Sequence, residues 1–559
     1  MSSLYIKDRL ALIDYTSKYF NNYEELLSSE EFFQFMSSFL FDLRKKHHDL
    51  FVWALKKDTF EESINYLIKT AKLLSVFPLE DVSRIKEDDV PKYLELVEAA
   101  YRYWRDLHRF SVTFSDNPEG VLLSGFMNSE ERFNQLIISL YRLIQEKLQG
   151  HKNSIYRQLQ AGTNGGLLLC NNALNLEGVY SVLNSVPVVE KVIMRAPMII
   201  HLEHNKRIGK YEPRYDNPLL KDIDLKDFFA YPCFVGESYT LVIFHKKYTP
   251  SAIGLANLFE FADFRYINEK PKCIVLFGVN DGSDELTYYY DKENDIYLGY
   301  ISDRPIIEYF GYFKKTMLTL HNLSMISKGR VPIHGAMLNV YLKDGRKKGV
   351  CLMGDSGCGK SESIEAMSKL SDEIEYQEII FDDMGTMYTN DDGEVVAVGT
   401  EIGAFVRLDD LDKGSAYKDM DRSVFFNPEF KNSRVVSPAT TYKAISRENK
   451  VDIFLYANNY TDEKGVKLTD AISAKNSYKE GKRMAIGTTN ETGLTTTYFA
   501  NPFGPMQEQD KCDPLIDELF DNLERSGVKL GQLYTHLGLP DRDEGIALAA
   551  EELLKIIKE

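Results

Sequence analysis

The chain has 559 residues, of which 67 are Lys or Arg and 84 are Asp or Glu, so its formal net charge is −17 at pH 7. Hydrophobic residues make up 44% of the sequence, a fraction typical of globular proteins, which excludes a disordered or fibrous chain. The acidic balance argues against a broad nucleic-acid surface, because such a surface needs clustered Lys and Arg to neutralise phosphates.

Targeting and membrane segments are not evident in the sequence. No basic region followed by an apolar stretch occurs near Met1, and no run of about 18 uncharged apolar residues could cross a bilayer. The 6 cysteines are far apart and lack the Cys-x-x-Cys spacing of a zinc site, a usage typical of reduced thiols inside the cell. We therefore expect a cytoplasmic protein that binds neither membrane nor nucleic acid.

Residues 1–150 have the pattern of a helical domain. Apolar residues recur at three- and four-residue spacing in several segments, and no glycine precedes Gly120. We expect an all-helical N-terminal domain that serves as a scaffold or as an oligomer contact, because it contains no recognisable chemical motif. The helical segments are 30–46, 60–74, 90–109 and 129–148.

From about residue 151 the pattern becomes that of an α/β protein. Short apolar strands at 198–202, 239–244 and 273–277 alternate with helical stretches. We expect an α/β domain on the substrate side over 151–300. A nucleotide- and metal-binding domain should follow over 301–559, with a helical tail at 514–559.

The strongest motif of the chain lies in the last of these domains. Residues 354–361 read Gly-Asp-Ser-Gly-Cys-Gly-Lys-Ser, which fits the phosphate-loop pattern Gly-x-x-x-x-Gly-Lys-[Ser/Thr]. An apolar strand at 349–353 precedes the loop and a helical pattern at 362–370 follows it, which is the context the motif requires. Its backbone N–H groups would surround the phosphates of a nucleotide. The expected nucleotide-binding residues are Gly354, Asp355, Ser356, Gly357, Cys358, Gly359, Lys360 and Ser361.

Within this loop, two side chains have separate tasks. Lys360 would reach the β- and γ-phosphates, and the Ser361 hydroxyl would bind Mg²⁺. Downstream, the apolar segment 379–381 ends in Asp382 and Asp383. A strand that delivers carboxylates beside a phosphate loop is typical of a divalent-cation site, so we expect this aspartate pair to bind metal rather than to form a solvated turn.

Around the loop the chain resembles the phosphoenolpyruvate carboxykinase family, over roughly 300–510. The sequence Tyr-Phe-Gly-Tyr-Phe-Lys-Lys-Thr-Met, beginning at Tyr309, is similar to the Tyr-x-Gly-x-x-Lys-Lys segment of that family. His334 follows Lys315 at a spacing similar to the family's, and Asn-Ser-Arg-Val around Arg434 resembles its Asn-Thr-Arg-Val element. The order of lysine pair, histidine, phosphate loop, aspartate pair and arginine is also the order found in that family.

The resemblance implies a two-lobed α/β core with its site in the cleft between the lobes. It implies an enzyme that interconverts oxaloacetate and a nucleoside triphosphate with phosphoenolpyruvate, CO₂ and the nucleoside diphosphate. Mn²⁺ would be bound by Lys315, His334 and Asp383, and a lysine ligand must be the neutral amine. Mg²⁺ and ATP or GTP would complete the set of cofactors, and the base preference stays open, as does a phosphoryl donor other than a nucleotide.

The remaining residues of the resemblance have roles beside the reacting atoms. Lys314 would keep its charge near the reacting oxygen, and Arg434 would bridge the transferring phosphoryl group and the substrate. Tyr309 would line the pocket for substrate or CO₂. No motif identifies the arginine that would bind the substrate carboxylate. Arg157 in the polar loop 156–164 is the candidate, and a structural arginine in a turn is the equal alternative.

A second family offers a different function for the same loop. His-Gly-Ala from His334, followed by a loop that ends Gly-Lys-Ser-Glu, is similar to HPr kinase/phosphorylase, which phosphorylates a protein serine. There Asp382 or Asp383 would act as the base. Tyr309, the lysine pair and Arg434 favour the carboxykinase. The alternatives are thus a kinase acting on a small-molecule or protein hydroxyl, and a nucleotide-binding regulatory protein.

Overall fold

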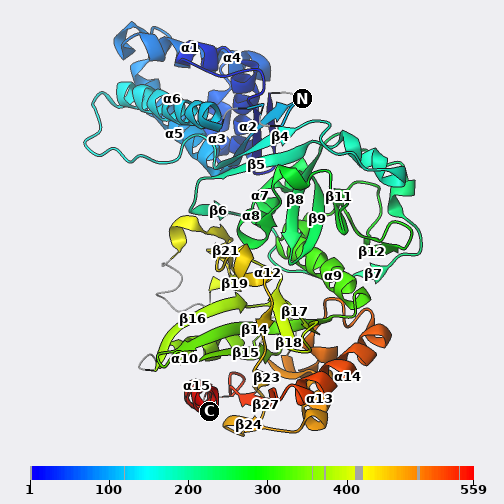
Figure 1. The fold of residues 1–559 in the computed structure, drawn as a ribbon. Coiled ribbons are helices and arrows are strands. Elements are labelled where there is room, and N and C mark those ends of the chain that lie inside the picture. The colour runs from blue at the N-terminus through cyan, green and yellow to red at the C-terminus, as the bar shows by residue number, and fades with distance from the viewer. Residues whose placement is uncertain are drawn as a thin grey trace. The chain divides into compact units, whose positions relative to one another are not determined.

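The computed structural model describes residues 3–118, 120–121, 123–355, 357–370, 373–408, 419–486, 492–539 and 542–559. The chain divides into two compact units: Met1–Asn175 with Leu183–Met198, and Leu176–Val182 with Ile199–Glu559. Both units mix helices with sheets, so the α/β fold class expected from the sequence is confirmed (Figure 1). No helix in the described part of the chain is long and apolar enough to cross a membrane.

The first unit is rich in helices whose apolar faces share one core. Ser29 caps the start of α2 by accepting from Phe32 N–H, and Thr59 forms a capping box with Glu62 at the start of α4. Of the four helical segments expected from the sequence, 30–46, 60–74 and 129–148 are confirmed, whereas 90–109 is helical only as far as Asp106, because His108 begins a strand. The helices are α1 (Tyr23–Leu27), α2 (Glu30–Lys46), α3 (His48–Ala54), α4 (Phe60–Val76), α5 (Val90–Asp106) and α6 (Leu123–Gln149).

The expectation of an all-helical N-terminal domain is wrong, because strands flank these helices. β2 pairs in parallel with β3, about a hundred residues later in the chain, with Leu10 opposite His108. A short apolar run has no periodicity that separates a strand from a buried helix segment, and its distant partner is invisible in a local pattern. The strands of this unit are β1 (Leu4–Lys7), β2 (Leu10–Asp14), β3 (His108–Ser115), β4 (Gly165–Cys170) and β5 (Val188–Met194).

In the second unit, one sheet precedes the phosphate loop. Its strand order is β8-β9-β11-β13-β12-β7, and β10 pairs with β8. The expected strands at 239–244 and 273–277 are confirmed as β9 and β11, and the segment expected at 198–202 contains β6 (Met198–Ile200). The bounds are β7 (Glu212–Pro213), β8 (Phe228–Val235), β9 (Ser238–His245), β10 (Glu260–Phe261), β11 (Cys273–Val279), β12 (Leu286–Asp291) and β13 (Ile296–Ser302). The short helices α7 (Thr249–Ala252) and α8 (Leu255–Leu258) follow β9.

A second sheet carries the phosphate loop, with the strand order β22-β18-β17-β14-β15-β23-β27-β24 and with β16 pairing with β14. The loop leaves β15, which runs parallel to β23, and β23 runs parallel to β27. The bounds are β14 (Val331–Leu342), β15 (Lys347–Met353), β16 (Ile374–Phe381), β17 (Met384–Thr389), β18 (Val395–Gly399), β22 (Asn449–Lys450), β23 (Ile453–Asn458), β24 (Gly465–Leu468) and β27 (Lys529–Tyr534).

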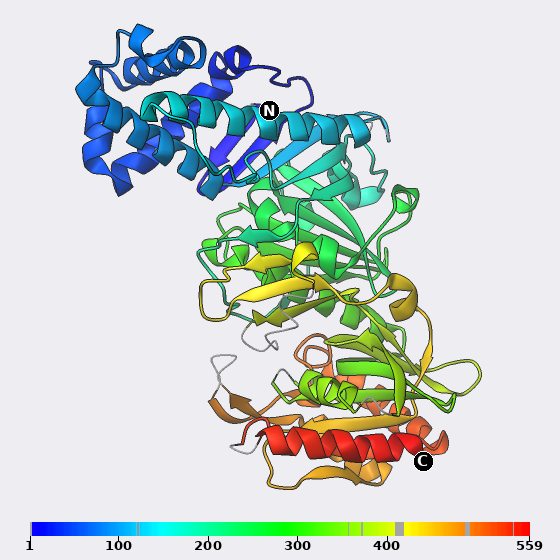
Figure 2. The same cartoon turned by 90° about the vertical axis from the view of Figure 1, so that its left-hand side faces the viewer.

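Helices cover both faces of this sheet. Residues of α10 (Lys360–Ser368) and α15 (Arg542–Lys558) pack with one set of buried strand side chains, and residues of α13 (Ala471–Glu480) and α14 (Gln509–Arg525) pack with another. Figure 2 shows α15 lying along the strands. The expected helical tail is wrong at 529–534, where β27 is a six-residue strand. A short strand between two longer helical patterns has no distinct periodicity.

Two smaller sheets complete the unit. One has four strands in the order β19 (Gly403–Arg407), β21 (Arg434–Pro438), β20 (Val424–Phe426) and β6, and the other is the pair β25 (Lys482–Ile486) and β26 (Thr492–Thr496). The short helix α12 (Tyr442–Ser446) follows β21. Between the two large sheets lies α9 (Gly311–Ser327), which contacts β11 and β13 on one side and β14 and β17 on the other (Figure 1).

Candidate functional site

The helix α9 holds two consecutive lysines in a buried environment. Lys314 Nζ lies 2.7 Å from Asp383 Oδ2 and 2.8 Å from Glu401 Oε1, and its side chain is 1% exposed. Burial alone would lower the pKa of Lys314, but the two carboxylates raise it above its ordinary value. Lys314 is therefore held as a charged ammonium.

Lys315 lies beside the same aspartate but is paired less closely. Its Nζ is 3.4 Å from Asp383 Oδ2 and 4.1 Å from the centroid of the Phe503 ring. Burial lowers the pKa of Lys315 to about 8, with the charge of Lys314 adding to the effect and Asp383 opposing it. This amine can lose its proton near neutral pH, which a lysine needs before it can bind a metal ion.

His334, near the start of β14, completes a cluster around Asp383. Its Nδ1 lies 2.7 Å from the Ala500 carbonyl oxygen, and its Nε2 lies 3.1 Å from Asp383 Oδ1. Because a carbonyl only accepts, Nδ1 carries the proton, and the Nε2 of a neutral ring then presents a lone pair to a carboxylate oxygen. Two acceptors at this distance need a proton or a cation between them. The donor set of one amine, one imidazole and one carboxylate suits a divalent transition metal such as Mn²⁺.

The phosphate loop begins where β15 ends and is anchored to the same strand as His334. The Gly354 N–H donates to the His334 carbonyl at 3.0 Å. Gly359 has a φ of +92°, and a Cβ there would lie 2.6 Å from the Thr535 Cβ, so the loop requires glycine at this position. Gly354, Asp355, Gly357, Cys358, Gly359, Lys360 and Ser361 lie in this strand–loop–helix arrangement, and Ser356 lies outside the described residues.

The charged side chains of the phosphate loop bind to groups of the protein itself. Lys360 Nζ donates to the carbonyl oxygens of Gly354 at 2.8 Å and Asp355 at 3.1 Å. Asp355 Oδ2 forms an ion pair with Arg483 Nε at 3.0 Å, and Asp355 Oδ1 lies 3.6 Å from His334 Nδ1. The loop and the His334 cluster are thus in direct contact.

The aspartate pair between β16 and β17 connects the two parts of the site. Asp382 Oδ1 accepts from the Ser361 hydroxyl at 2.9 Å, whereas Asp383 faces the lysines and His334. Burial raises the pKa of Asp382 to about 6. Burial would also raise the pKa of Asp383, but the charges of Lys314 and Lys315 hold it well below its ordinary range.

Arg434 and Tyr309 both lie beside the Phe405 ring, which also lies near Lys314. The Phe405 ring centroid in β19 lies 5.4 Å from the Arg434 guanidinium carbon, 5.5 Å from Lys314 Nζ and 6.1 Å from the Tyr309 ring centroid. Arg434 donates one hydrogen bond to Asn432 Oδ1 at 3.0 Å. Its buried Nε has no hydrogen-bond partner in the part of the chain that the structure describes, so one donor remains for a ligand.

The structure adds two residues that the sequence did not single out. Glu401, just after β18, is 5% exposed, and burial raises its pKa to about 7 although Lys314 opposes the shift. Arg207 lies beside the Phe503 ring, with its guanidinium carbon 5.9 Å from the centroid, and its charge contributes to the lowered pKa of Lys315. Neither residue belongs to a fixed-spacing motif. The basic run Lys206–Arg207 with Lys210 was the only signal for Arg207.

The Arg207 loop is attached to the helix that carries the lysines. The Ile208 N–H donates to the Tyr312 hydroxyl at 2.8 Å, and that hydroxyl donates to the Ile208 carbonyl at 3.0 Å. Tyr312 lies on α9, one turn from Lys315, so α9 positions the arginine as well as the lysine pair. Arg157 belongs to the other compact unit, where it is exposed and its carbonyl accepts from Arg142. Its proposed role stays a prediction.

In the described residues, no group of three or more His, Cys, Asp and Glu side chains could hold a metal ion. The metal site considered above therefore depends on a lysine as its third ligand. No protein-family model and no curated protein sequence matches this chain.

Proposed function

We propose that the chain is a phosphoenolpyruvate carboxykinase-like enzyme whose second unit is the family's two-lobed core. The proposal rests on one observation: Lys314, Lys315 and His334 surround Asp383 beside a phosphate loop. A phosphate loop alone supports any nucleotide-dependent reaction. The charged Lys314, the low-pKa Lys315 and the His334 lone pair together favour a centre that stabilises an enolate oxygen.

The residues present fit the metal ions that this reaction uses. Lys315, His334 and Asp383 would hold Mn²⁺, and Ser361 with Asp382 would hold the Mg²⁺ of the nucleotide. Bound there, the divalent cation supplies positive charge where negative charge develops on the substrate oxygen.

The side chains of the protein perform the remaining tasks. Lys360 leaves the carbonyls of Gly354 and Asp355 and binds the phosphates of the nucleotide, which offer it stronger, charged acceptors. Arg434 directs its guanidinium donors at the transferring phosphoryl group, and Lys314 keeps a fixed positive charge next to the reacting oxygen.

Arg207 is the better candidate for the arginine that binds the substrate carboxylate. It lies against Phe503 together with Lys315, and its loop is fixed to α9 by Tyr312. A guanidinium presents paired donors that match a carboxylate, so this position would orient the dicarboxylate beside the lysine pair.

The test is fixation of ¹⁴C-bicarbonate from phosphoenolpyruvate, with oxaloacetate trapped by malate dehydrogenase and NADH. The reaction contains Mn²⁺ and Mg²⁺, and ADP, GDP or inorganic phosphate is supplied separately as the phosphoryl acceptor. Acceptor-dependent fixation that is absent from Lys360→Ala supports the proposal and identifies the phosphoryl carrier. Lack of fixation with every acceptor, from protein that binds nucleotide, contradicts it.

A kinase acting on a hydroxyl group is the second candidate. The contact between Ser361 and Asp382 places a carboxylate at the start of α10, where the γ-phosphate of a bound nucleotide would lie. Such a carboxylate can orient an attacking hydroxyl. This enzyme would transfer ³²P from the nucleotide to a hydroxyl substrate without any exchange of CO₂, which separates it from the carboxykinase.

A further inference from the structure

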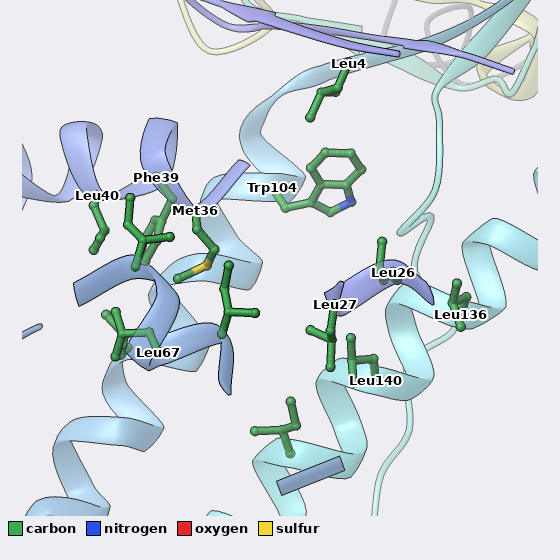
Figure 3. Close-up of a cluster of buried hydrophobic side chains, with 14 of the residues drawn as sticks. Leu4, Leu26, Leu27, Met36, Phe39, Leu40, Leu67, Trp104, Leu136 and Leu140 are labelled. Atoms are coloured by element: carbon green, nitrogen blue, oxygen red, sulfur yellow. The ribbon is translucent and has the colours of Figure 1, made fainter. Parts of the chain in front are cut away.

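A cavity of about 170 Å³ lies among the helices of the first unit. Apolar side chains from α1, α2, α4, α5 and α6 surround it, and Figure 3 shows several of them converging on this region. Protein interiors are normally packed as densely as organic crystals, so a space of this size is unusual. An engineered apolar cavity of about 150 Å³ in another protein stays dry and binds benzene. Lining residues drawn in Figure 3 include Leu26, Leu27, Met36, Leu67, Trp104 and Leu140.

Rigid aromatic side chains hold one wall of the cavity in place. Trp104 Nε1 donates to the Ala161 carbonyl at 2.6 Å, which fixes the orientation of the indole. The rings of Phe35 and Phe133 meet Trp104 edge-on, with centroid distances of 5.6 and 6.2 Å. Because each aromatic ring has few torsions and touches another ring, the wall cannot simply collapse to fill the space.

Most polar atoms near the cavity are already engaged with the protein. The Thr70 hydroxyl donates to the Tyr66 carbonyl at 2.8 Å, and the Tyr141 hydroxyl donates to Glu98 at 2.9 Å. The buried Tyr93 hydroxyl lies near Tyr66 and Thr70 but makes no hydrogen bond of ordinary geometry within the described residues. The cavity therefore offers mainly apolar surface to a ligand.

The lining contains one carboxyl group, that of Glu31, and its negative charge disfavours the binding of anions. Burial would raise the pKa of Glu31, but hydrogen bonds from Lys18, at 2.7 Å, and from Ser3 lower it below its ordinary value. Glu31 thus remains a carboxylate, already paired, at the edge of the apolar space. A second carboxylate brought into this cavity would be desolvated without a free cation in the lining to pair with it.

We propose that the first unit binds an uncharged apolar small molecule, of the size of one aromatic ring with a short alkyl chain, in this cavity. The partly exposed lining residues Phe32, Ala100 and Tyr101 bring the cavity close to the surface, which allows a ligand to enter. The site belongs to the first unit alone and is independent of the reaction proposed for the second.

The test is calorimetric titration of the full chain with n-butylbenzene and with 4-phenylbutyrate, its carboxylate-bearing counterpart. Saturable binding of one n-butylbenzene per chain is expected, with 4-phenylbutyrate weaker by about tenfold or more because its charge must be desolvated. In a Trp53→Phe background, the emission of Trp104 should change with the same saturation curve, because Trp104 lines the cavity. No saturable binding of n-butylbenzene, or equal binding of both compounds, overturns the proposal.

Cavity-filling variants locate the bound molecule. Ala100→Leu on α5 and Ala71→Leu on α4 place extra carbon atoms in the cavity and should each weaken n-butylbenzene binding about tenfold or more. Ala99→Leu is the matched control, since Ala99 neighbours Ala100 on α5 but does not line the cavity. Each variant is first checked for native circular dichroism, and the two filling variants serve as substitutes for one another if one misfolds. Unchanged binding to a folded filling variant places the ligand elsewhere and overturns the proposal.

Discussion

Lys314 pairs with two carboxylates, Asp383 and Glu401, so we expect it to stabilise the fold as well as to take part in the chemistry. Asp383 Oδ2 lies 2.7 Å and Glu401 Oε1 2.8 Å from its Nζ; Lys314 and Glu401 are buried, and the Asp383 side chain is 23% exposed. Lys314→Met should lower the free energy of unfolding by about 3–5 kcal/mol, because it leaves the buried Glu401 without its cation and removes the closer of the two lysines from Asp383. Urea unfolding followed by circular dichroism measures this change.

A double-mutant cycle separates charge balance from packing at this position. Adding Glu401→Gln to Lys314→Met removes the carboxylate that has lost its cation, so it should restore about 1–2 kcal/mol of the lost stability. The same Glu401→Gln change in the wild-type background should be destabilising, since it breaks one of the two pairs. If the two changes were simply additive, the Lys314–Glu401 pair would contribute nothing.

Arg207 and Arg157 provide a direct comparison at the residue scale. If Arg207 binds the substrate carboxylate, Arg207→Ala should raise KM for phosphoenolpyruvate or oxaloacetate by about ten- to hundredfold. Arg157→Ala, an equal change at an exposed arginine of the other unit, should leave KM unchanged. The measurement is steady-state kinetics of ¹⁴C fixation. The reverse pattern would return the carboxylate-binding role to Arg157.

The contrast between these residues indicates what a sequence can predict about a site. The lysine pair, His334 and the aspartate pair were singled out by their order around the phosphate loop, and the structure brings Lys314, Lys315, His334 and Asp383 within a few ångströms of one another. Glu401 and Arg207 are not part of that order, because they reach Lys314 and Lys315 from loops that end at separate strands. Only the folding of the chain makes them neighbours.

At the scale of the element, α9 carries a second buried base that the proposed reaction does not use. His321 is 2% exposed, and its Nδ1 lies 3.0 Å from Asn322 Oδ1. Burial lowers its pKa to about 4, with Lys328 and Arg330 contributing and Glu237 opposing the shift. At pH values between this native pKa of about 4 and the ordinary histidine pKa of about 6.5, the unfolded chain binds more protons than the folded one. His321 therefore reduces the free energy of unfolding as the pH falls through this range.

This linkage predicts a pH-dependent loss of stability that one substitution removes. From pH 7 to pH 4, His321 should cost the native state about 3 kcal/mol, and His321→Gln should show a correspondingly smaller loss over that interval. His151→Gln, a change at an exposed histidine, serves as the control and should keep the wild-type dependence. Urea unfolding at several pH values measures the difference, and parallel curves for wild type and His321→Gln would contradict the assignment.

Helices were the elements most accessible to prediction. α2 matches the expected segment 30–46 because its apolar period is sustained for more than four turns and Ser29 marks its start. β2, β3 and β27 were not predicted, since each is a short strand whose stability comes from a partner strand far along the chain. The strand before the phosphate loop was predicted because the motif itself requires it.

At the scale of the whole molecule, each compact unit has its own hydrophobic core. Leu43 belongs to the core of the first unit, and Leu553 belongs to a core of the second, beside the sheet of the phosphate loop. The 2 tryptophans of the chain, Trp53 and Trp104, both lie in the first unit. Tryptophan fluorescence therefore reports the unfolding of that unit, whereas far-ultraviolet circular dichroism follows both.

We expect these cores to respond separately to cavity-forming substitutions. Leu43→Ala should destabilise the first unit by about 2–5 kcal/mol and lower the fluorescence midpoint in urea, because Leu43 is 2% exposed. Leu553→Ala, at a fully buried leucine of α15, should lower a circular dichroism transition by a similar amount and leave the fluorescence midpoint in place. If Leu553→Ala shifted both probes equally, the chain would unfold as one cooperative system. Separate midpoints would mean that the apolar cavity and the phosphate-loop site can each be altered without loss of the other.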